Sequence, residues 1–359
     1  MIFINGRFLT MTITGVQRYA QELFRALDEV LLDIFPGEAA PIVCFVPPGC
    51  SENPHWKKID LRVVGRNTGN LWEQIDLPWN AQAGLLFSPA NIGPYLHPNQ
   101  VVTIHDASVF AFPRAYSLAF RMKYRLIYPR MAKVARKIIT VSQFSRKELV
   151  RYCRFPEERL EVIAHGCEHL SRLVADESIL DRCGIRKRSY LLGVGSWSLH
   201  KNFDALIKAF QLLGRDDLSL VLVGGEFKHI FRSSEKEIPA NTIYLRNVRD
   251  DELQALYQNA VSLVFPSIYE GFGLPVLEAM SAGCPVICSH ASSLPEVGGE
   301  AALYFDPRNV QELSDRMRSL LDSDELRESM QLKGKIQSQK FSWKEAAKKT
   351  WEILVSMAR

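Results

Sequence analysis

Short apolar runs alternate with amphipathic stretches along most of the chain. Runs of four or five apolar residues are typical of strands buried in a parallel sheet. In the first half, the pattern predicts strands at residues 1–4, 42–46, 60–64, 85–87, 100–104, 137–141 and 160–163. Apolar spacing of three and four residues predicts helices at 14–32, 72–79 and 142–151. This strand–helix alternation predicts an α/β fold with parallel strands.

The same alternation restarts after a polar, irregular stretch at residues 171–188. Further strands are expected at 190–194, 218–223, 242–245, 261–265, 285–288 and 301–305. Helices are expected at 203–213, 250–260 and 276–282, and through the tail at 310–359. Because the series occurs twice, we expect two Rossmann-like domains, residues 1–170 and 189–342, with a linker at 171–188.

The most informative stretch follows the expected strand at 261–265. It contains a glycine-rich turn, Glu270-Gly271-Phe272-Gly273. Pro275 suits the first turn of a helix because it has no N–H group to leave unpaired. Gly283 can end that helix, and a second apolar run follows at 285–288. The stretch therefore predicts a βαβ unit.

The turn between this strand and helix is suited to a phosphate or a sugar. Gly271 and Gly273 let backbone N–H groups come close to a ligand, and a helix N-terminus favours negative charge. Glu270 precedes the turn and Glu278 lies one turn into the helix. Both can point toward a ligand at the carboxyl end of the strand, the usual position in open parallel sheets.

The string from Glu270 to Glu278 resembles the Glu-x7-Glu motif of retaining GT-B glycosyltransferases of family 4, group 1. The similarity includes the intervening glycines, Pro275, Ala279 and the Ala282-Gly283 step before a strand. It implies a GT-B fold, in which two Rossmann-like domains face each other across a cleft. It also implies a last helix, 343–359, that packs back on the N-terminal domain. The chain looks closest to bacterial polysaccharide mannosyltransferases within this family.

The resemblance implies roles for several donor-side residues. Glu270 would hold sugar hydroxyls or stabilise the positive ring, and Glu278 would accept hydrogen bonds from the ribose. Lys201 resembles the lysine of the family's phosphate-binding loop, although an ordinary surface lysine is the alternative. Ser196 stands where many members have an arginine. His200 occupies the place of an arginine in the polysaccharide mannosyltransferases.

Two more segments complete the expected donor site. Gly15 matches a glycine turn that faces the reaction centre in the family, and Asn247-Val248 resembles the loop beside the nucleotide base. The expected catalytic residues are His105, Glu270 and Lys201. The expected donor contacts are Gly15, Ser196, His200, Lys201, Asn247, Val248, Glu270, Gly271, Phe272, Gly273, Leu274 and Glu278.

A histidine ends the expected strand at 100–104. A lone histidine in such a place is usually structural, but strand ends in α/β sheets also host ligands. His105-Asp106 resembles a His-Asp dipeptide of the family, which implies that His105 contacts the donor sugar. Asp106 would orient the loop or the ring. Arg18, Tyr19 and Asp106 are expected to face the acceptor, and a plain helix entry is the alternative for the segment around Arg18.

The stretch 107–147 contains no Asp or Glu but ten Lys and Arg, with interleaved aromatic residues. A solvated basic helix is one interpretation. A surface that contacts anionic lipid headgroups is the other, and we predict peripheral membrane contact through this stretch. No recognition motif supports nucleic acid as a partner.

Cysteine usage and hydropathy indicate the cellular setting. The seven cysteines have no CxxC pair and no regular spacing, which favours a reducing, cytoplasmic compartment. No apolar run reaches the length of a membrane-spanning helix. We therefore expect a cytoplasmic protein that is peripheral on the inner face of the plasma membrane. Asp322-Ser323-Asp324 has the pattern of a helix cap, so no metal and no cofactor are expected.

Together these observations predict a retaining hexosyltransferase. The expected donor is a nucleotide-sugar, GDP-mannose, and the expected acceptor is a lipid-linked or other saccharide in bacterial O-antigen or exopolysaccharide synthesis. A UDP- or dTDP-sugar donor is an alternative, as is a non-catalytic sugar-nucleotide-binding scaffold. A nicotinamide dehydrogenase would need Gly-x-Gly-x-x-Gly after a strand, and Gly193-Val-Gly195 lacks the third glycine.

Overall fold

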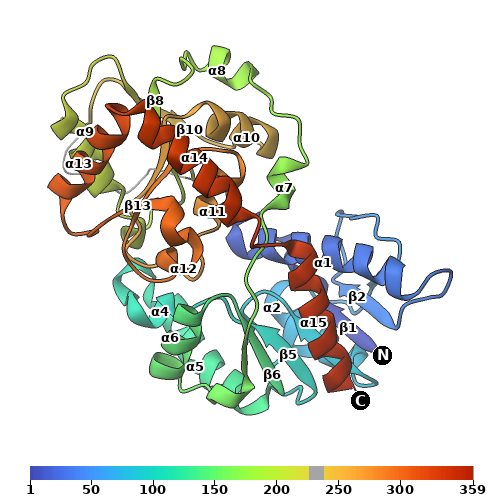
Figure 1. The fold of residues 1–359 in the computed structure, drawn as a ribbon. Helices are drawn as coiled ribbons and strands as arrows, with labels where there is room; N and C mark the ends of the chain where they lie inside the picture. The colour runs from blue at the N-terminus through green and yellow to red at the C-terminus, as the bar shows by residue number, and fades with distance from the viewer. Residues whose placement is uncertain (226–237, 359) are drawn as a thin grey trace. The chain divides into compact units, whose positions relative to one another are not determined.

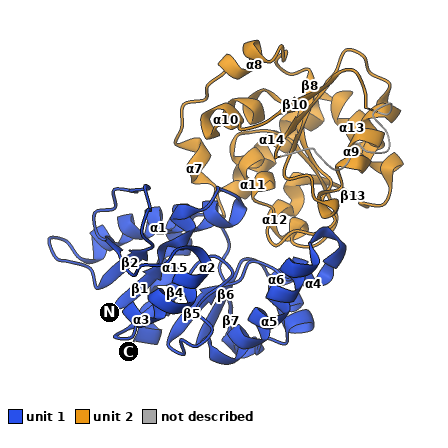
Figure 2. Ribbon diagram, turned by 180° about the vertical axis from the view of Figure 1, so that it is seen from behind, with its two compact units in different colours: residues 1–166, 342–359 blue, residues 167–341 orange. Residues whose placement is uncertain are grey.

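The computed structural model describes residues 1–225 and 238–358 of the chain. The chain divides into two units (Figure 2): unit 1 comprises Met1–Gly166 and Ser342–Arg359, and unit 2 comprises Cys167–Phe341. Each unit is built around its own parallel sheet.

Unit 1 holds a parallel sheet, in which residues 1–166 contribute seven strands in the order β3-β2-β1-β4-β5-β6-β7. The strands are β1 (Ile2–Asn5), β2 (Ile42–Val46), β3 (Asp60–Val63), β4 (Leu85–Ser88), β5 (Gln100–Thr103), β6 (Lys137–Thr140) and β7 (Leu160–Val162). The order reverses direction between β1 and β4, because the chain moves from β1 to β2 and β3 and then returns to the other side of β1.

The helices of unit 1 lie between these strands and after them (Figure 1). They are α1 (Gly15–Ile34), α2 (Gly69–Leu71), α3 (Leu77–Asn80), α4 (Ser108–Ala111), α5 (Leu118–Val134), α6 (Gln143–Cys153) and α15 (Trp343–Ala358). Short 3₁₀ turns are η1 (Gly6–Thr10), η3 (Pro113–Ala115) and η4 (Glu157–Arg159), and a π-helical turn, η2 (Trp72–Asp76), joins α2 to α3.

The C-terminal helix α15 packs along α1 within unit 1. The ring centroids of Tyr19 and Trp343 lie 5.9 Å apart, and those of Phe35 and Trp351 lie 6.1 Å apart with the rings edge to face. Trp343 is completely buried. Aromatic pairs of this kind contribute beyond the area that they bury, so they fix α15 on α1.

Unit 2 contains the second parallel sheet. In its described parts, residues 167–225 and 238–341, six strands have the order β10-β9-β8-β11-β12-β13. The strands are β8 (Tyr190–Val194), β9 (Ser219–Val223), β10 (Thr242–Leu245), β11 (Ser262–Phe265), β12 (Val286–Ser289) and β13 (Ala302–Phe305). The helices are α7 (Glu168–Ser171), α8 (Ser178–Arg182), α9 (Phe203–Leu213), α10 (Asp250–Asn259), α11 (Leu274–Ser281), α12 (Leu294–Gly298), α13 (Val310–Leu321) and α14 (Asp324–Ser338). The 3₁₀ turns are η5 (Leu199–Lys201) and η7 (Gly299–Ala301).

Helix α9 shows why the sequence pattern places an element correctly. Its apolar positions recur every three or four residues, and Phe203, Leu206 and Phe210 are buried against the sheet. Full burial of each such side chain stabilises a fold by about 1.5–3 kcal/mol. Asn202 precedes the helix with a φ of 57°, and its side-chain amide donates to Pro266 O and Pro307 O. These bonds fix the loop that enters α9.

The boundary between the units lies at Gly166, before the expected position at residue 170. Cys167 Sγ lies 3.7 Å from Ser338 O, which joins the start of unit 2 to α14. The expected linker at 171–188 belongs to unit 2 and contains α8, whose Ile179 and Leu180 are buried. The polar composition of this segment predicted a linker. Two or three buried side chains are nevertheless enough to dock such a short segment on unit 2.

The two parallel α/β sheets agree with the expected fold class, two Rossmann-like domains. Over the ranges that the structure describes, no helix has both the length and the apolar character needed to cross a bilayer. Ser323 caps α14 by accepting a hydrogen bond from Leu326 N at 3.1 Å, which confirms the expected cap in the Asp322-Ser323-Asp324 string.

Candidate active site

The glycine-rich turn connects β11 to α11 in unit 2. Helix α11 begins at Leu274, two residues before its expected start, with Pro275 in its first turn. Gly273 caps it with a φ of 102°, and a Cβ atom there would lie 2.5 Å from Leu294 Cδ2. Both the left-handed backbone and the crowding require glycine at this position. The first N–H groups of α11 therefore follow directly on the turn.

Two serines hold the turn in shape. Ser293 Oγ donates to Glu270 O at 3.0 Å and to Phe272 O at 2.8 Å. Glu270 N donates to Ser292 Oγ at 3.0 Å. These bonds fix the backbone on both sides of Gly271, from which the Glu270 side chain extends toward Lys201. Neither serine was among the predicted site residues.

Lys201 and Glu270 form an ion pair in unit 2. Lys201 Nζ lies 2.7 Å from Glu270 Oε1, and the two side chains are 17% and 11% exposed. The lysine Nζ also lies 5.4 Å from the centroid of the Phe265 ring, within cation–π distance. The structure therefore brings together two of the three predicted catalytic residues, although 69 positions separate them in the sequence.

The loop between β8 and α9 carries Lys201 and docks against the turn. Ile268 N donates to His200 O at 2.7 Å, which ties the two segments together. Ser198 Oγ lies 3.2 Å from His200 Nε2 and 3.1 Å from Ser196 Oγ. Ser196 is exposed and His200 is half-buried. The three polar side chains thus form one hydrogen-bonded group in the loop that positions Lys201.

Glu278 lies in the interior of unit 2, on α11. Its Oε1 lies 2.9 Å from His169 Nε2, and its Oε2 accepts a hydrogen bond from the Tyr257 hydroxyl at 3.1 Å. All three residues are at most 7% exposed. Both carboxylate oxygens therefore have a protein partner, and any ribose hydroxyl has to use their remaining lone pairs.

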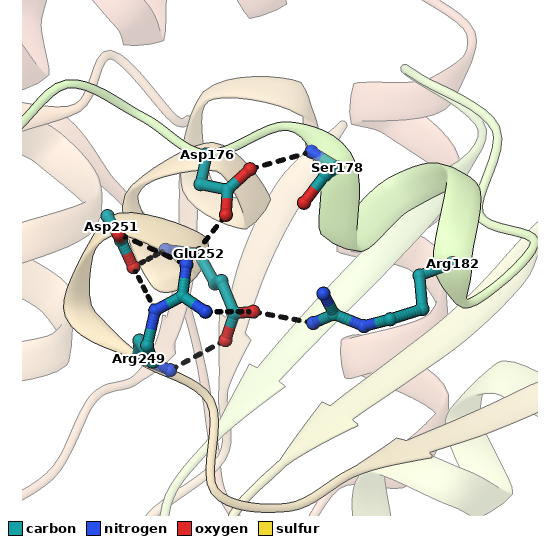
Figure 3. A network of polar contacts seen from close by, with 6 residues as sticks. All are labelled: Asp176, Ser178, Arg182, Arg249, Asp251 and Glu252. Atoms are coloured by element: carbon teal, nitrogen blue, oxygen red, sulfur yellow. Dashed lines mark hydrogen bonds and ion pairs between the residues drawn. The ribbon is translucent and has the colours of Figure 1, made fainter.

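Asn247 and Val248 lie between β10 and α10, with Asn247 exposed at a φ of 52°. A polar network next to this loop fixes its far end (Figure 3). Arg249 Nη2 lies 2.6 Å from Asp176 Oδ2, and Arg249 Nε lies 3.0 Å from Asp251 Oδ1. The loop that was predicted to lie beside the nucleotide base is therefore anchored to the segment before α8.

The same network caps α10. Arg249 N donates to Glu252 Oε2 at 2.8 Å, and Arg182 Nη2 pairs with Glu252 Oε1 at 2.5 Å (Figure 3). Exposed ion pairs contribute roughly 0–1 kcal/mol each, so the network is better understood as a set of positional restraints. Glu252 is the exception because it is only 3% exposed, and a buried carboxylate needs such partners.

His105 lies in unit 1, just beyond β5. Its backbone N–H donates to Asn91 Oδ1 at 2.8 Å. Its ring Nε2 lies 3.3 Å from Pro89 O, and because a carbonyl can only accept, this contact places the imidazole proton on Nε2. Burial lowers the pKa of His105 to about 4, although Asp106 and the Pro89 carbonyl act in the opposite direction. The imidazole is therefore neutral at physiological pH.

An aromatic cluster surrounds His105 in unit 1. The Tyr19 ring meets it edge on, with the centroids 4.7 Å apart. His165 lies 5.0 Å from Tyr19 and stacks on Trp343 at 5.5 Å. Tyr19 is fully buried and its hydroxyl lies 3.3 Å from Thr103 Oγ1. The Tyr19 ring packs on His105 and has no exposed surface, which does not fit its predicted acceptor contact.

The remaining predicted residues of unit 1 have mixed surroundings. Gly15 is exposed at the first position of α1, and no atom lies within 4 Å of a Cβ placed there. Arg18 is 19% exposed and lies 3.9 Å from Glu22. Asp106 Oδ1 accepts a hydrogen bond from Ser108 N at 2.7 Å, which suits the predicted role in orienting its own loop.

Comparison with known proteins now identifies the family. The profile described as Glycosyl transferases group 1 matches residues 179–337, and the one described as Glycosyltransferase Family 4 matches residues 39–169. The O-antigen chain mannosyltransferase B of Escherichia coli is 35% identical over 269 residues, which cover 72% of this chain and 70% of that protein. The chain belongs to glycosyltransferase family 4, group 1.

Solved structures agree with this family 4 assignment at the level of the fold. The sucrose-phosphate synthase of Thermosynechococcus elongatus has a TM-score of 0.74 at 18% identity and covers 99% of this chain and 98% of its own. HepE of Anabaena, in complex with UDP and glucose, has a TM-score of 0.73 at 16% identity, with 99% of both chains covered. The predicted GT-B fold is confirmed, and the alternative of a nicotinamide dehydrogenase is excluded.

Sequence reasoning missed several residues that shape the site of this family 4 glycosyltransferase. His169 and Tyr257 bind Glu278, while Ser292 and Ser293 hold the turn at Glu270. One signal was present in the sequence: a glutamate in an otherwise apolar helix is buried and needs hydrogen-bonding partners. The identity of those partners depends on which helices pack together, and that is not written in any local pattern.

The lowered pKa of His105 predicts how stability changes with pH. Between about pH 6.5 and pH 4 the unfolded chain takes up a proton on this imidazole that the folded chain does not. The free energy of unfolding should therefore be highest above that window and fall by about 3 kcal/mol across it. His105→Gln should flatten this part of the curve in urea unfolding at a series of pH values. The exposed His55→Gln serves as the control, and an unchanged slope in His105→Gln would contradict the buried, neutral imidazole.

Proposed function

We propose that this glycosyltransferase is a retaining enzyme that transfers mannose from GDP-mannose to a lipid-linked saccharide in bacterial surface-polysaccharide synthesis. The observation that carries the proposal is the Lys201–Glu270 ion pair beside the start of α11. It sets one cation, one carboxylate and a helix N-terminus close together. The similarity to an O-antigen chain mannosyltransferase supports mannose as the sugar and O-antigen synthesis as the pathway.

Departure of the nucleoside diphosphate is the step that this arrangement favours. Negative charge develops on the leaving phosphate, and the Lys201 ammonium and the first amides of α11 stabilise it. Lys201 then has two anionic neighbours, the phosphate and Glu270. Before the donor arrives, the pair with Glu270 alone keeps the ammonium oriented. The proposal needs no metal ion and no further cofactor, because the lysine and the helix supply the positive charge.

The remaining polar groups act on the sugar and the nucleoside. Glu270 holds sugar hydroxyls or stabilises the positive ring of the transition state. Neutral His105, whose Nδ1 remains an acceptor, receives a hydrogen bond from a sugar hydroxyl. Glu278, oriented by His169 and Tyr257, accepts from the ribose. The leaving phosphate removes the acceptor's proton on the same face, so that the anomeric configuration is retained.

Helix α5 supports the proposed contact with a membrane surface. Leu118, Met122 and Leu126, the α5 apolar row, recur every four residues and are 69%, 47% and 72% exposed. Arg125 and Arg130 are exposed on the same helix, and its opposite side is buried in unit 1. Basic amphipathic helices of this type lie in the headgroup region, and each cation near an anionic surface adds about 1 kcal/mol. The enzyme would therefore work at the inner face of the plasma membrane.

Calorimetric titration with GDP, UDP, dTDP and ADP, with and without magnesium, tests the donor assignment. We expect selective GDP binding that does not depend on magnesium, because Lys201 and α11 neutralise the diphosphate. Turnover of GDP-mannose on a lipid-linked acceptor should then give the α-linked product expected of retention from an α-linked donor. Selective binding of UDP would change the assigned donor from a GDP-sugar to a UDP-sugar. Binding of none of the four nucleotides would favour the scaffold alternative.

A further inference from the structure

A charged cluster that the donor chemistry does not use lies at the carboxyl ends of two central strands of the unit 1 sheet. Asn5 ends β1 and Ser88 ends β4, and these strands adjoin at the point where the strand order reverses. Asn5 Nδ2 donates to Ser88 Oγ at 3.3 Å and to Glu73 Oε1 at 2.8 Å. In open parallel sheets, ligands bind outside the carboxyl ends of the strands at such a reversal.

Arg7 pairs with a buried carboxylate at this point, and Lys123 lies close enough to both groups to interact with them electrostatically. Arg7 Nη1 lies 2.6 Å from Glu73 Oε2, and Glu73 is only 4% exposed. Burial lowers the pKa of Lys123, the nearby Arg7 lowers it further, and Glu73 partly offsets both effects. The acceptor for Lys123 Nζ is the neutral Asn70 Oδ1, at 3.2 Å. The cluster of Arg7, Lys123 and Glu73 thus carries one excess positive charge, which a bound anion would neutralise.

The cluster adjoins His105 in unit 1. The segment from Ser88 to Asn91 contacts both of them, since Ser88 accepts from Asn5 while Pro89 O and Asn91 Oδ1 accept from His105. An anion held by Arg7 and Lys123 therefore lies one loop away from the imidazole that is proposed to contact the donor sugar.

Exposed apolar side chains lie on both helices that the Lys123–Asn70 bond connects. On α5 they are the α5 apolar row, which includes Met122, next to Lys123 in sequence. On the α2–α3 segment Leu71, Ile75 and Trp79 also recur every four residues and are 61%, 56% and 76% exposed. A ligand that matches both the positive cluster and the exposed apolar side chains has an anionic group attached to a long hydrocarbon chain.

We propose that Arg7 and Lys123 bind the phosphate or diphosphate that joins lipid to sugar in the acceptor. The lipid chain would leave along the exposed side chains of α5 and α2–α3, and the sugar would extend toward His105. This inference rests on the proposed function, because it assumes a lipid-linked acceptor. It adds the subsite that would distinguish such an acceptor from a free saccharide.

The test compares Lys123→Gln with Arg125→Gln in the full chain. Each variant removes one positive charge from α5, but Arg125 is exposed and lies outside the cluster. Binding is measured to phosphatidylcholine vesicles that contain either a long-chain isoprenyl diphosphate or phosphatidylglycerol. We expect wild-type protein to prefer the isoprenyl diphosphate. Lys123→Gln should bind it about tenfold less tightly, the loss of one charge-assisted hydrogen bond. Arg125→Gln should weaken binding to both vesicles by the same small factor.

A second measurement, of acceptor kinetics, also uses Lys123→Gln and not a variant of the buried Arg7–Glu73 pair. Arg7→Gln leaves Glu73 unpaired and can unfold the protein, so Lys123→Gln carries the kinetic test. It should raise KM for the isoprenyl diphosphate-linked acceptor with kcat and GDP affinity unchanged. Equal effects of Lys123→Gln and Arg125→Gln on both vesicles, or no preference of the wild type for isoprenyl diphosphate, would overturn the subsite. Failure of the proposed donor chemistry would appear separately, as absent GDP binding in the wild type.

Discussion

Glu270→Gln is expected to lower turnover by about two to three orders of magnitude, the typical effect of removing one preorganised group that stabilises charge in a transition state. The substitution keeps the shape of the side chain and removes its charge. Lys201 loses its ion-pair partner, but its loop stays docked through the hydrogen bond from Ile268 N to His200 O. Nucleotide affinity should therefore change little or increase, because the diphosphate no longer competes with a carboxylate for the ammonium.

The measurement is turnover of GDP-mannose together with GDP affinity and the thermal midpoint of unfolding. The matched control is Glu300→Gln, which removes an exposed carboxylate elsewhere in unit 2 and should leave turnover near the wild-type value. Wild-type turnover in Glu270→Gln would refute its catalytic role. A collapse of the thermal midpoint would instead show that the ion pair is structural.

Lys201→Met is expected to weaken GDP binding by about 10- to 100-fold, because one charge-assisted hydrogen bond to the diphosphate is lost. Methionine keeps most of the aliphatic chain, so packing near Phe265 is largely preserved. GMP, which lacks the second phosphate, should lose much less affinity than GDP. Calorimetric titration of both nucleotides with the variant measures this difference.

Lys208→Met is the control for Lys201→Met. Lys208 is exposed on α9, a few residues beyond the same loop, so its removal changes the net charge equally without touching the turn. Equal GDP affinities for Lys201→Met and the wild type would exclude a phosphate contact. Equal losses for GDP and GMP would place the lysine beside another part of the nucleotide.

The sequence was most informative where structure depends on local chemistry. The strand at 42–46 and the helix at 203–213 were predicted at their observed bounds, because apolar periodicity reports burial directly. The glycines predicted the turn at Gly273 equally well, because the left-handed backbone found there favours glycine. The Lys201–Glu270 pair was approached through the family resemblance, while its hydrogen bond was set by the docking of two loops.

Other features depended on packing between distant segments. His169 was assigned to the N-terminal domain, yet it binds Glu278 from the start of unit 2. The family resemblance implied that Tyr19 faces the acceptor, but its ring packs against Trp343 of α15 and its hydroxyl against Thr103 of β5. Neither outcome can be read from residue spacing, because 109 positions separate His169 from Glu278 and Trp343 lies near the opposite end of the chain from Tyr19.

The return of α15 to unit 1 makes unit 2 an uninterrupted insert in the chain of unit 1. A fragment that ends at residue 166 would lack the helix that covers α1 and would expose the apolar face on which Trp343 and Trp351 pack. It would also lose the ring that stacks on His165, beside His105. Dissection of this enzyme should therefore excise residues 167–341 as one piece and rejoin residues 166 and 342 through a short linker, since cutting the chain in two would disturb the surroundings of His105.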